Sequence, residues 1–173
     1  QRQMCIRDSD HIDIDPKNIH IPDGTLKAEE IENFCKEYER QIEAAGGIDI
    51  QVLGIGRTGH IGFNEPGSPL TSKTRMVYLD DLTIKDAAGD FGGMENVPSR
   101  AITMGVGTIM KARKVILLAW GEKKASIIKA TVEGSVSDAV PATFLQVHPN
   151  VQFVIDESAA EELTRANQPW LVS

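Results

Sequence analysis

The 173-residue chain has few cysteines, no long apolar run and no excess of basic residues. Its longest apolar stretch, 115–120, is far too short to cross a bilayer, so we predict no membrane contact. The formal net charge of -7 argues against a nucleic-acid-binding surface, although a local basic pocket for a small anion is compatible with it. With 41% hydrophobic and 25% charged residues, the composition is that of a single globular domain.

Residues 1–9 have no apolar periodicity, and they resemble the translated sequence of a transposon-end adapter used in DNA library preparation. We therefore interpret 1–9 as a scar that is not part of the fold, and 10–173 as the folded part. Because this interpretation removes Cys5, only Cys35 remains in the folded part. An intrachain disulfide is then excluded, and a reducing, cytoplasmic compartment is the simplest expectation.

Apolar residues follow helical and strand periods in turn along the chain. Thr25 is a candidate N-cap for a helix whose apolar stripe includes Cys35, and Gly46-Gly47 ends that helix. Segment 80–98 has a weak pattern, which is equally typical of a mobile flap and of a surface loop. Strands are predicted at 48–53, 76–79, 101–104, 114–120 and 151–155, and further helices at 109–112, 122–133, 141–147 and after the cap Ser158.

The order of these elements predicts an α/β fold with three layers. Strands separated by helices indicate a mostly parallel, Rossmann-like sheet with helices on both faces. The strand at 114–120 is apolar on both faces, as a central parallel strand should be. The strand at 48–53 delivers a glycine-rich loop at its C-terminal end, where open α/β sheets bind their ligands.

That loop, 54–68, gathers five glycines around His60 and Glu65. An imidazole titrates near neutral pH, and a neighbouring carboxylate can fix its tautomer and raise its basicity. The two side chains are therefore candidate proton-transfer residues, although a hydrogen-bonded loop histidine gives the same pattern. Lys123 and Lys124, at the start of the helix predicted at 122–133, suit a phosphate, with a solvated lysine pair as the alternative.

The run from Gly54 to Ser68 reads GIGRTGHIGFNEPGS, and it resembles the signature of glucosamine-6-phosphate deaminases, which is close to G-x-G-x-D-G-H-I-A/G-F-N-E-P. Sugar-phosphate lactonases have a related loop, but the continuation Phe63-Asn64-Glu65-Pro66 is closer to the deaminases. The likeness continues in register over about 10–162. Later segments that agree with the family are Thr74-Arg75, 101–108, 121–125, 132–134 and 145–149.

The resemblance implies conversion of glucosamine 6-phosphate and water into fructose 6-phosphate and ammonia, without a metal or an organic cofactor. In this scheme His60 moves the proton that opens the sugar ring, Glu65 orients His60, and Lys124 holds the phosphate. A sugar phosphate is then the small-molecule partner, and we expect the intact protein to be a homo-oligomer. The implied substrate-binding residues are Gly54, Gly56, Thr58, Gly59 and Lys124.

Two positions near the site depart from the family pattern. Thr58 stands where the family has an aspartate, and a hydroxyl cannot supply that negative charge. Residues 87–90 lack the arginine that the family commonly places near Phe91, so phosphate affinity is reduced or is supplied elsewhere.

Ser68 and Arg75 are candidate allosteric residues, because bacterial members with allosteric control have basic residues after the motif. Val77 stands where a lysine is typical of those members, so we do not assume activation by an acetylated amino-sugar phosphate.

The family's enolisation base, an aspartate, and its Gly/Ser-rich phosphate loop precede this region, and neither is found in 10–51. We therefore interpret 10–173 as the C-terminal two-thirds of one deaminase/isomerase domain, with a sheet that is incomplete at the N-terminus. We expect this chain alone to release no measurable ammonia, and to expose apolar sheet surface and aggregate. The alternatives are a non-catalytic sugar-phosphate-binding regulatory module and a 6-phosphogluconolactonase-like hydrolase.

Overall fold

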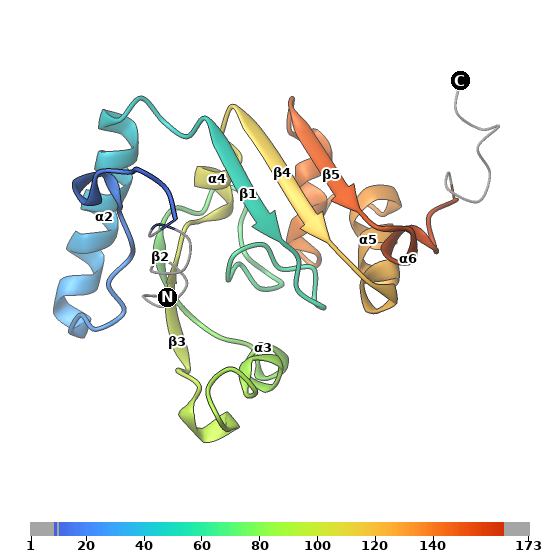
Figure 1. Cartoon of the computed structure of the whole chain (residues 1–173), viewed down its shortest axis with the longest axis horizontal. Coiled ribbons are helices and arrows are strands. Elements are labelled where there is room, and N and C mark those ends of the chain that lie inside the picture. Colours follow the sequence, from blue (N-terminus) through green and yellow to red (C-terminus); the bar gives the residue numbers. More distant parts are fainter. Residues whose placement is uncertain (1–8, 10, 165–173) are drawn as a thin grey trace.

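A computed structural model of the chain describes residue 9 and residues 11–164. Within this part, three parallel strands form one sheet in the order β1-β4-β5, namely β1 (Ile50–Gly54), β4 (Lys114–Ala119) and β5 (Val151–Ile155). Two further strands, β2 (Arg75–Tyr78) and β3 (Arg100–Thr103), pair antiparallel in a separate ribbon beside helix α2 (Figure 1). The mostly parallel α/β fold is confirmed, whereas the antiparallel ribbon was not predicted.

The helices follow the strands in the predicted alternation, with several boundaries displaced. α4 begins three residues before the predicted helix at 109–112, and the predicted helix at 122–133 starts as a 3₁₀ turn before it becomes α5. Asp156, and not Ser158, caps α6, because its side chain accepts from the Ala159 N–H. The helical elements are η1 (Pro16–Asn18), α2 (Ala28–Ala44), α3 (Asp81–Ala87), η2 (Met94–Asn96), α4 (Val106–Ile109), η3 (Glu122–Lys124), α5 (Ala125–Glu133), η4 (Pro141–Val147) and α6 (Glu157–Ala160).

Helix α2 packs against the β2–β3 ribbon through its apolar stripe, and Cys35 on that stripe is buried as predicted. The prediction that Thr25 caps this helix is wrong: Thr25 bonds Asp23, and Lys27 is the N-cap. The Lys27 N–H is satisfied by the side chain of Glu30 in the first turn, where a negative charge also suits the helix dipole. Buried Glu39 was not predicted, and its carboxylate accepts from Thr74 and Thr108.

Segment 80–98 is ordered into α3 and η2. Asp80 caps α3 by accepting from the Leu82 N–H, which satisfies one of the free donors of the first turn. This segment forms the lobe at the bottom of Figure 1, beyond the end of the β2–β3 ribbon.

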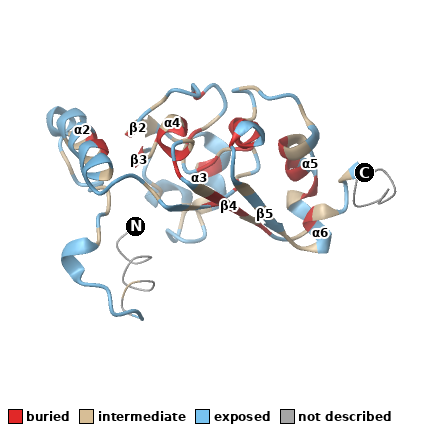
Figure 2. Ribbon diagram, turned by 90° about the horizontal axis from the view of Figure 1, so that it is seen from above, coloured by how far each residue is buried: buried red, intermediate tan, exposed pale blue. Residues whose placement is uncertain are grey.

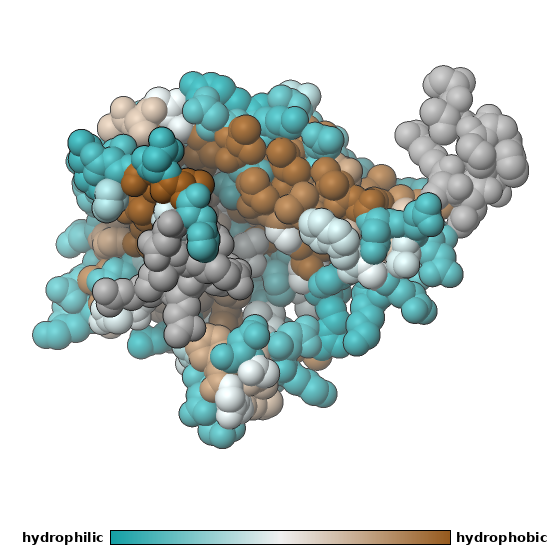
Figure 3. All heavy atoms as spheres, in the orientation of Figure 1, coloured by the Kyte–Doolittle hydropathy of each residue, from teal (hydrophilic) through white to brown (hydrophobic). Residues whose placement is uncertain are grey.

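The core lies on one face of the three-stranded sheet. Leu53, Val115 and Leu117 point into it and pack with apolar residues of α5 and η4. On the opposite face Ile50, Val52 and Val154 are 58%, 56% and 39% exposed. Figure 2 shows this contrast between buried and exposed positions, and Figure 3 shows the hydrophobic surface over β1, β4 and β5. Within the described residues, the predicted helical layer is therefore present on one face only, while the predicted exposure of apolar sheet surface is confirmed.

Candidate active site

The glycine-rich loop leaves the C-terminal end of β1, beside the C-terminal end of β4, where open α/β sheets bind ligands. Ile55 and Ile61 anchor it, since both side chains are buried in the core. The Asn64 amide fastens the other end by donating to Ile61 O and Met104 O, at 2.9 and 2.8 Å. The loop is thus held by the hydrophobic core and by a hydrogen bond to the residue that follows β3.

His60 and Glu65 converge as the sequence predicts. The His60 Nδ1 lies 3.0 Å from Glu65 Oε2, and their side chains are only 16% and 14% exposed. Thr58 Oγ1 is also 3.0 Å from both His60 Nδ1 and Glu65 Oε2. The second carboxylate oxygen, Oε1, accepts from Thr83 Oγ1 of α3. One carboxylate therefore accepts hydrogen bonds from three donors, two in the glycine-rich loop and one on α3.

These donors decide the charge state of Glu65. Burial by itself would raise the pKa of this carboxyl group, but the hydrogen bonds from His60, Thr83 and Thr58, together with the charge of His60, outweigh burial and lower the pKa to about 2. Glu65 is therefore ionised at neutral pH and can only accept hydrogen bonds.

An ionised Glu65 fixes the tautomer of neutral His60. Nδ1 carries the proton and donates it to Oε2, so Nε2 keeps its lone pair. Thr58 has a single hydroxyl proton, which it donates to Oε2. The geometry thus prepares Nε2 to accept a proton and to return it, which is general acid–base chemistry.

Gly56 supports the imidazole directly. A Cβ atom at this position would lie 2.1–2.5 Å from three atoms of the His60 ring, closer than any real contact. Gly59 has a positive φ of 78° and faces the side chains of Val140 and Ile127. The family resemblance implies that both residues bind substrate, and the structure adds a steric reason for glycine at each position.

Lys124 and its neighbour Lys123 have different surroundings. Lys124 is half-buried and its Nζ donates to Ile55 O at 2.8 Å, whereas Lys123 is exposed. Burial lowers the pKa of Lys124, while Asp86 raises it and Arg57 lowers it. Of the two lysines, only Lys124 thus lies against the glycine-rich loop.

Ser68 and Arg75 lie together on the far side of Asn64. Arg75 donates to Asn64 Oδ1 at 2.9 Å and to Ser68 Oγ at 3.1 Å. Burial lowers the pKa of Arg75, and no ion pair among residues 9 and 11–164 includes it.

Sequence reasoning missed Thr83, Arg57 and Asp86, which join α3 to the loop. Arg57 holds Asp86 through two hydrogen bonds of 2.8 and 2.6 Å. The signal for the helix that carries Thr83 and Asp86 was present in the cap-forming Asp80, two residues before the apolar Leu82, but the glycines in 89–93 obscured it.

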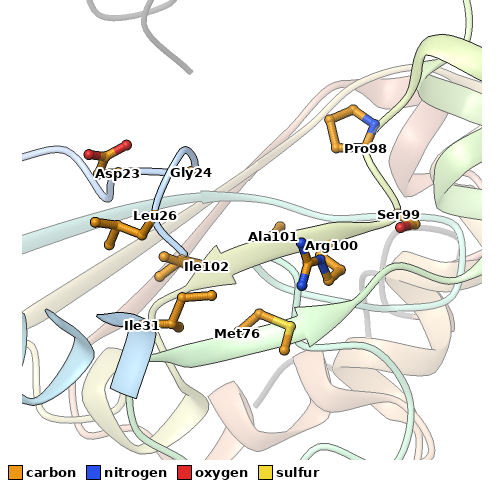
Figure 4. A pocket seen from close by; sticks show the side chains of 10 residues that line it. All are labelled: Asp23, Gly24, Leu26, Ile31, Met76, Pro98, Ser99, Arg100, Ala101 and Ile102. Carbon is orange, nitrogen blue, oxygen red and sulfur yellow. The ribbon is translucent and has the colours of Figure 1, made fainter. Parts of the chain in front are cut away.

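Two surface hollows lie away from His60. The first, of about 250 Å³, lies between the 23–31 segment and the β2–β3 ribbon, and Figure 4 shows Met76, Arg100 and Ile102 on its ribbon side. The second, of about 280 Å³, lies along α2 and includes Cys35 and Glu39. Across the described residues no group of three or more histidine, cysteine or acidic side chains is placed to hold a metal, and no helix there could span a membrane.

Comparisons with known proteins give a consistent assignment. Residues 3–154 match the family described as glucosamine-6-phosphate isomerases/6-phosphogluconolactonase. The chain is 56% identical to a glucosamine-6-phosphate deaminase of Shewanella woodyi, with 90% of this chain and 58% of that protein covered. It is 54% identical to a glucosamine-6-phosphate deaminase-like protein of Bacteroides thetaiotaomicron, with 95% of this chain and 25% of that protein covered. The chain therefore spans between a quarter and three-fifths of these curated relatives.

Solved structures agree on the fold. A monomeric glucosamine-6-phosphate deaminase superposes with a TM-score of 0.87 and 38% identity, over 93% of this chain and 67% of that one. A 6-phosphogluconolactonase from Trypanosoma cruzi superposes with a TM-score of 0.61 at 23% identity, over 82% of this chain and 55% of that one, which supports the shared fold alone. The chain belongs to the glucosamine-6-phosphate isomerase/6-phosphogluconolactonase family.

Proposed function

We propose that this chain carries the ring-opening part of a glucosamine-6-phosphate deaminase site that functions within a longer protein. The observation that supports this most directly is the His60–Glu65 pair, with Nδ1 and Oε2 3.0 Å apart and Nε2 left free for proton exchange. The pair lies in a chain that is 51–56% identical to glucosamine-6-phosphate deaminases over 150–155 residues.

The proposed reaction converts glucosamine 6-phosphate and water into fructose 6-phosphate and ammonia. Opening the pyranose ring requires a proton to leave the C1 hydroxyl and a proton to reach the ring oxygen. His60 Nε2 accepts the first and returns it to the second, while Glu65 stabilises the imidazolium formed between the two transfers. Lys124 holds the phosphate as a point charge, and the backbones of Gly54, Gly56 and Gly59 approach the sugar.

Isomerisation also needs a base for the proton at C2, and we expect that base to lie outside this chain. The chain alone should then bind a sugar phosphate without turning it over. The longer protein that contains it should complete the reaction.

The test is ammonia release from glucosamine 6-phosphate, measured for the chain alone and for the longer protein, with and without His60→Gln. We expect ammonia only from the longer protein with His60 intact. Ammonia released at a normal rate by the chain alone would contradict the division of the site. Binding without turnover in the longer protein, both before and after Thr58→Asp, would indicate a regulatory module. Hydrolysis of 6-phosphogluconolactone without ammonia would indicate the lactonase alternative.

We also propose that Ser68 and Arg75 form an anion-binding site whose occupancy affects the glycine-rich loop. Arg75 bonds Asn64, and Asn64 bonds Ile61 O next to His60, so an anion at Arg75 acts on the imidazole through Asn64 and Ile61. Arg75→Gln should abolish any response of ammonia release to an added anionic effector while leaving the basal rate measurable. An effector response that survives the change would exclude this role.

The intact protein is proposed to work in the cytoplasm, to bind no nucleic acid and to form a homo-oligomer. The first two proposals rest on the reducing environment suggested by Cys35 and on the negative net charge. The solved relative with a TM-score of 0.87 is described as monomeric, so the oligomer needs its own test. Light scattering on the longer protein would decide it, and a monomer mass at all concentrations would be contrary to the proposal.

A further inference from the structure

An ion pair joins the glycine-rich loop to α3. Arg57 Nε and Nη2 donate to the two carboxylate oxygens of Asp86, at 2.8 and 2.6 Å. The side chains are 46% and 49% exposed, so solvent and solutes reach both. Asp86 lies three residues after Thr83, which bonds Glu65, and both side chains therefore extend from one face of α3 toward the loop.

Lys124 belongs to the same group of charges. Its Nζ is held 2.8 Å from Ile55 O, two residues before Arg57 in the loop. Asp86 and Arg57 both act on the pKa of Lys124, in opposite directions, so the three charges lie within electrostatic reach of one another. The group has two cations, Arg57 and Lys124, and one anion, Asp86, which is paired with Arg57.

We propose that Arg57 is a second phosphate-binding residue beside Lys124, and that Asp86 occupies its guanidinium until a phosphate takes its place. This inference rests on the proposed function, because Lys124 is the phosphate-binding lysine of that proposal. It adds a residue outside the recognised signature and gives Asp86 the role of an internal competitor.

The chemistry of the pair favours such an exchange. Arginine presents a planar fork that matches a carboxylate and a phosphate in the same way, so a phosphate can replace Asp86 without moving the guanidinium far. An exposed ion pair contributes little net free energy, so breaking it costs little. A phosphate carries more negative charge than a carboxylate and contacts Lys124 at the same time. The exchange therefore strengthens the electrostatic attraction at both Arg57 and Lys124.

The exchange leaves the proton-transfer residues in place. Asp86 does not contact His60 or Glu65 in any hydrogen bond of the described residues, whereas Thr83 keeps α3 attached to Glu65. Changing Asp86 should therefore alter anion affinity without displacing the imidazole. This separation makes the inference testable by binding alone.

The experiment is a titration of the chain with inorganic phosphate, glucosamine 6-phosphate and unphosphorylated glucosamine, followed by NMR shifts of backbone amides. The variants are Arg57→Gln, Asp86→Asn and Lys124→Gln. The matched control is Arg113→Gln, which breaks the exposed ion pair of Arg113 with Asp49 on another part of the surface.

We expect Arg57→Gln to weaken phosphate binding about tenfold, as for a charge-assisted hydrogen bond at a partly exposed site. Asp86→Asn should tighten it about threefold by removing the competitor, and Arg113→Gln should leave it unchanged. Wild-type affinity in Arg57→Gln, no gain in Asp86→Asn, or no saturable phosphate binding by the wild-type chain would each overturn the inference. If Lys124→Gln binds phosphate with wild-type affinity and glucosamine binds as tightly as its 6-phosphate, the proposed function itself fails. If Arg57→Gln alone leaves phosphate affinity unchanged, only the inference about Arg57 fails.

Discussion

Replacing Glu65 with glutamine should remove a pH-dependent part of the stability of this fold. The substitution keeps the shape of the side chain but not its charge. In the folded protein the pKa of Glu65 is lowered from 4.5 to about 2, because three donors and the charge of His60 outweigh its burial. Glutamine cannot titrate, so the variant lacks this contribution at every pH.

The direction follows from which state binds the proton more tightly. Because the folded-state pKa is below the unfolded one, the contribution is fully present above about pH 4.5 and is lost as the pH falls toward 2. At about 1.4 kcal/mol per unit of pKa, the lowering corresponds to roughly 3 kcal/mol of the free energy of unfolding. The side chain is only 14% exposed, so solvent screening reduces this value little.

The assay is urea unfolding followed by far-UV circular dichroism at several pH values from 5.5 to 2. The difference between wild type and Glu65→Gln should shrink by roughly 3 kcal/mol across this range, because other carboxyl groups titrate equally in both proteins. Glu37→Gln is the control: hydrogen bonds from Arg40 and Gln41 also lower the pKa of Glu37, but this carboxylate is exposed, so its pH-dependent difference should be much smaller. A direct ¹³C titration of the Glu65 carboxyl provides a second measurement. A constant difference at all pH values, or a Glu65 midpoint near 4.5, would refute the reasoning.

Three further outcomes are expected. Gly56→Ala should displace the His60 ring and, in the longer protein, lower ammonia release about 100-fold, whereas Gly24→Ala, which lies outside the glycine-rich loop and whose Cβ has nothing within 4 Å, should not; equal rates in the two variants would count against the steric role. Val52→Lys should reduce light scattering by the chain, because Val52 is 56% exposed on the uncovered sheet face; increased scattering would contradict that arrangement. Glu39→Ala should lower the free energy of unfolding by about 2–4 kcal/mol, since it leaves buried donors unsatisfied, and urea unfolding with an unchanged midpoint would exclude this.

The central part of the fold was predictable because its signals are local. β5 was predicted at its observed limits, and β4 was recognised as a central parallel strand from its continuous apolar residues. The site loop was predictable for the same reason, since His60 and Glu65 are close in sequence and the glycines of the loop mark tight turns. The error at Ser158 occurred because Asp156, two residues earlier, is also a cap-forming residue, and the sequence does not show which one bonds the backbone. The error at Thr25 occurred because the helix begins after Lys27, which is not a cap-forming residue type, and Glu30 satisfies the Lys27 N–H instead.

From the sequence alone we could predict the strand that delivers the loop, the His60–Glu65 pair and the 54–68 signature, because each depends on residues a few positions apart. Only the tertiary structure decided which distant side chains complete the site. Thr83 bonds Glu65 from 18 residues away, and Asp86 bonds Arg57 from 29 residues away. Such contacts depend on how α3 packs across the loop, and no local periodicity records that packing.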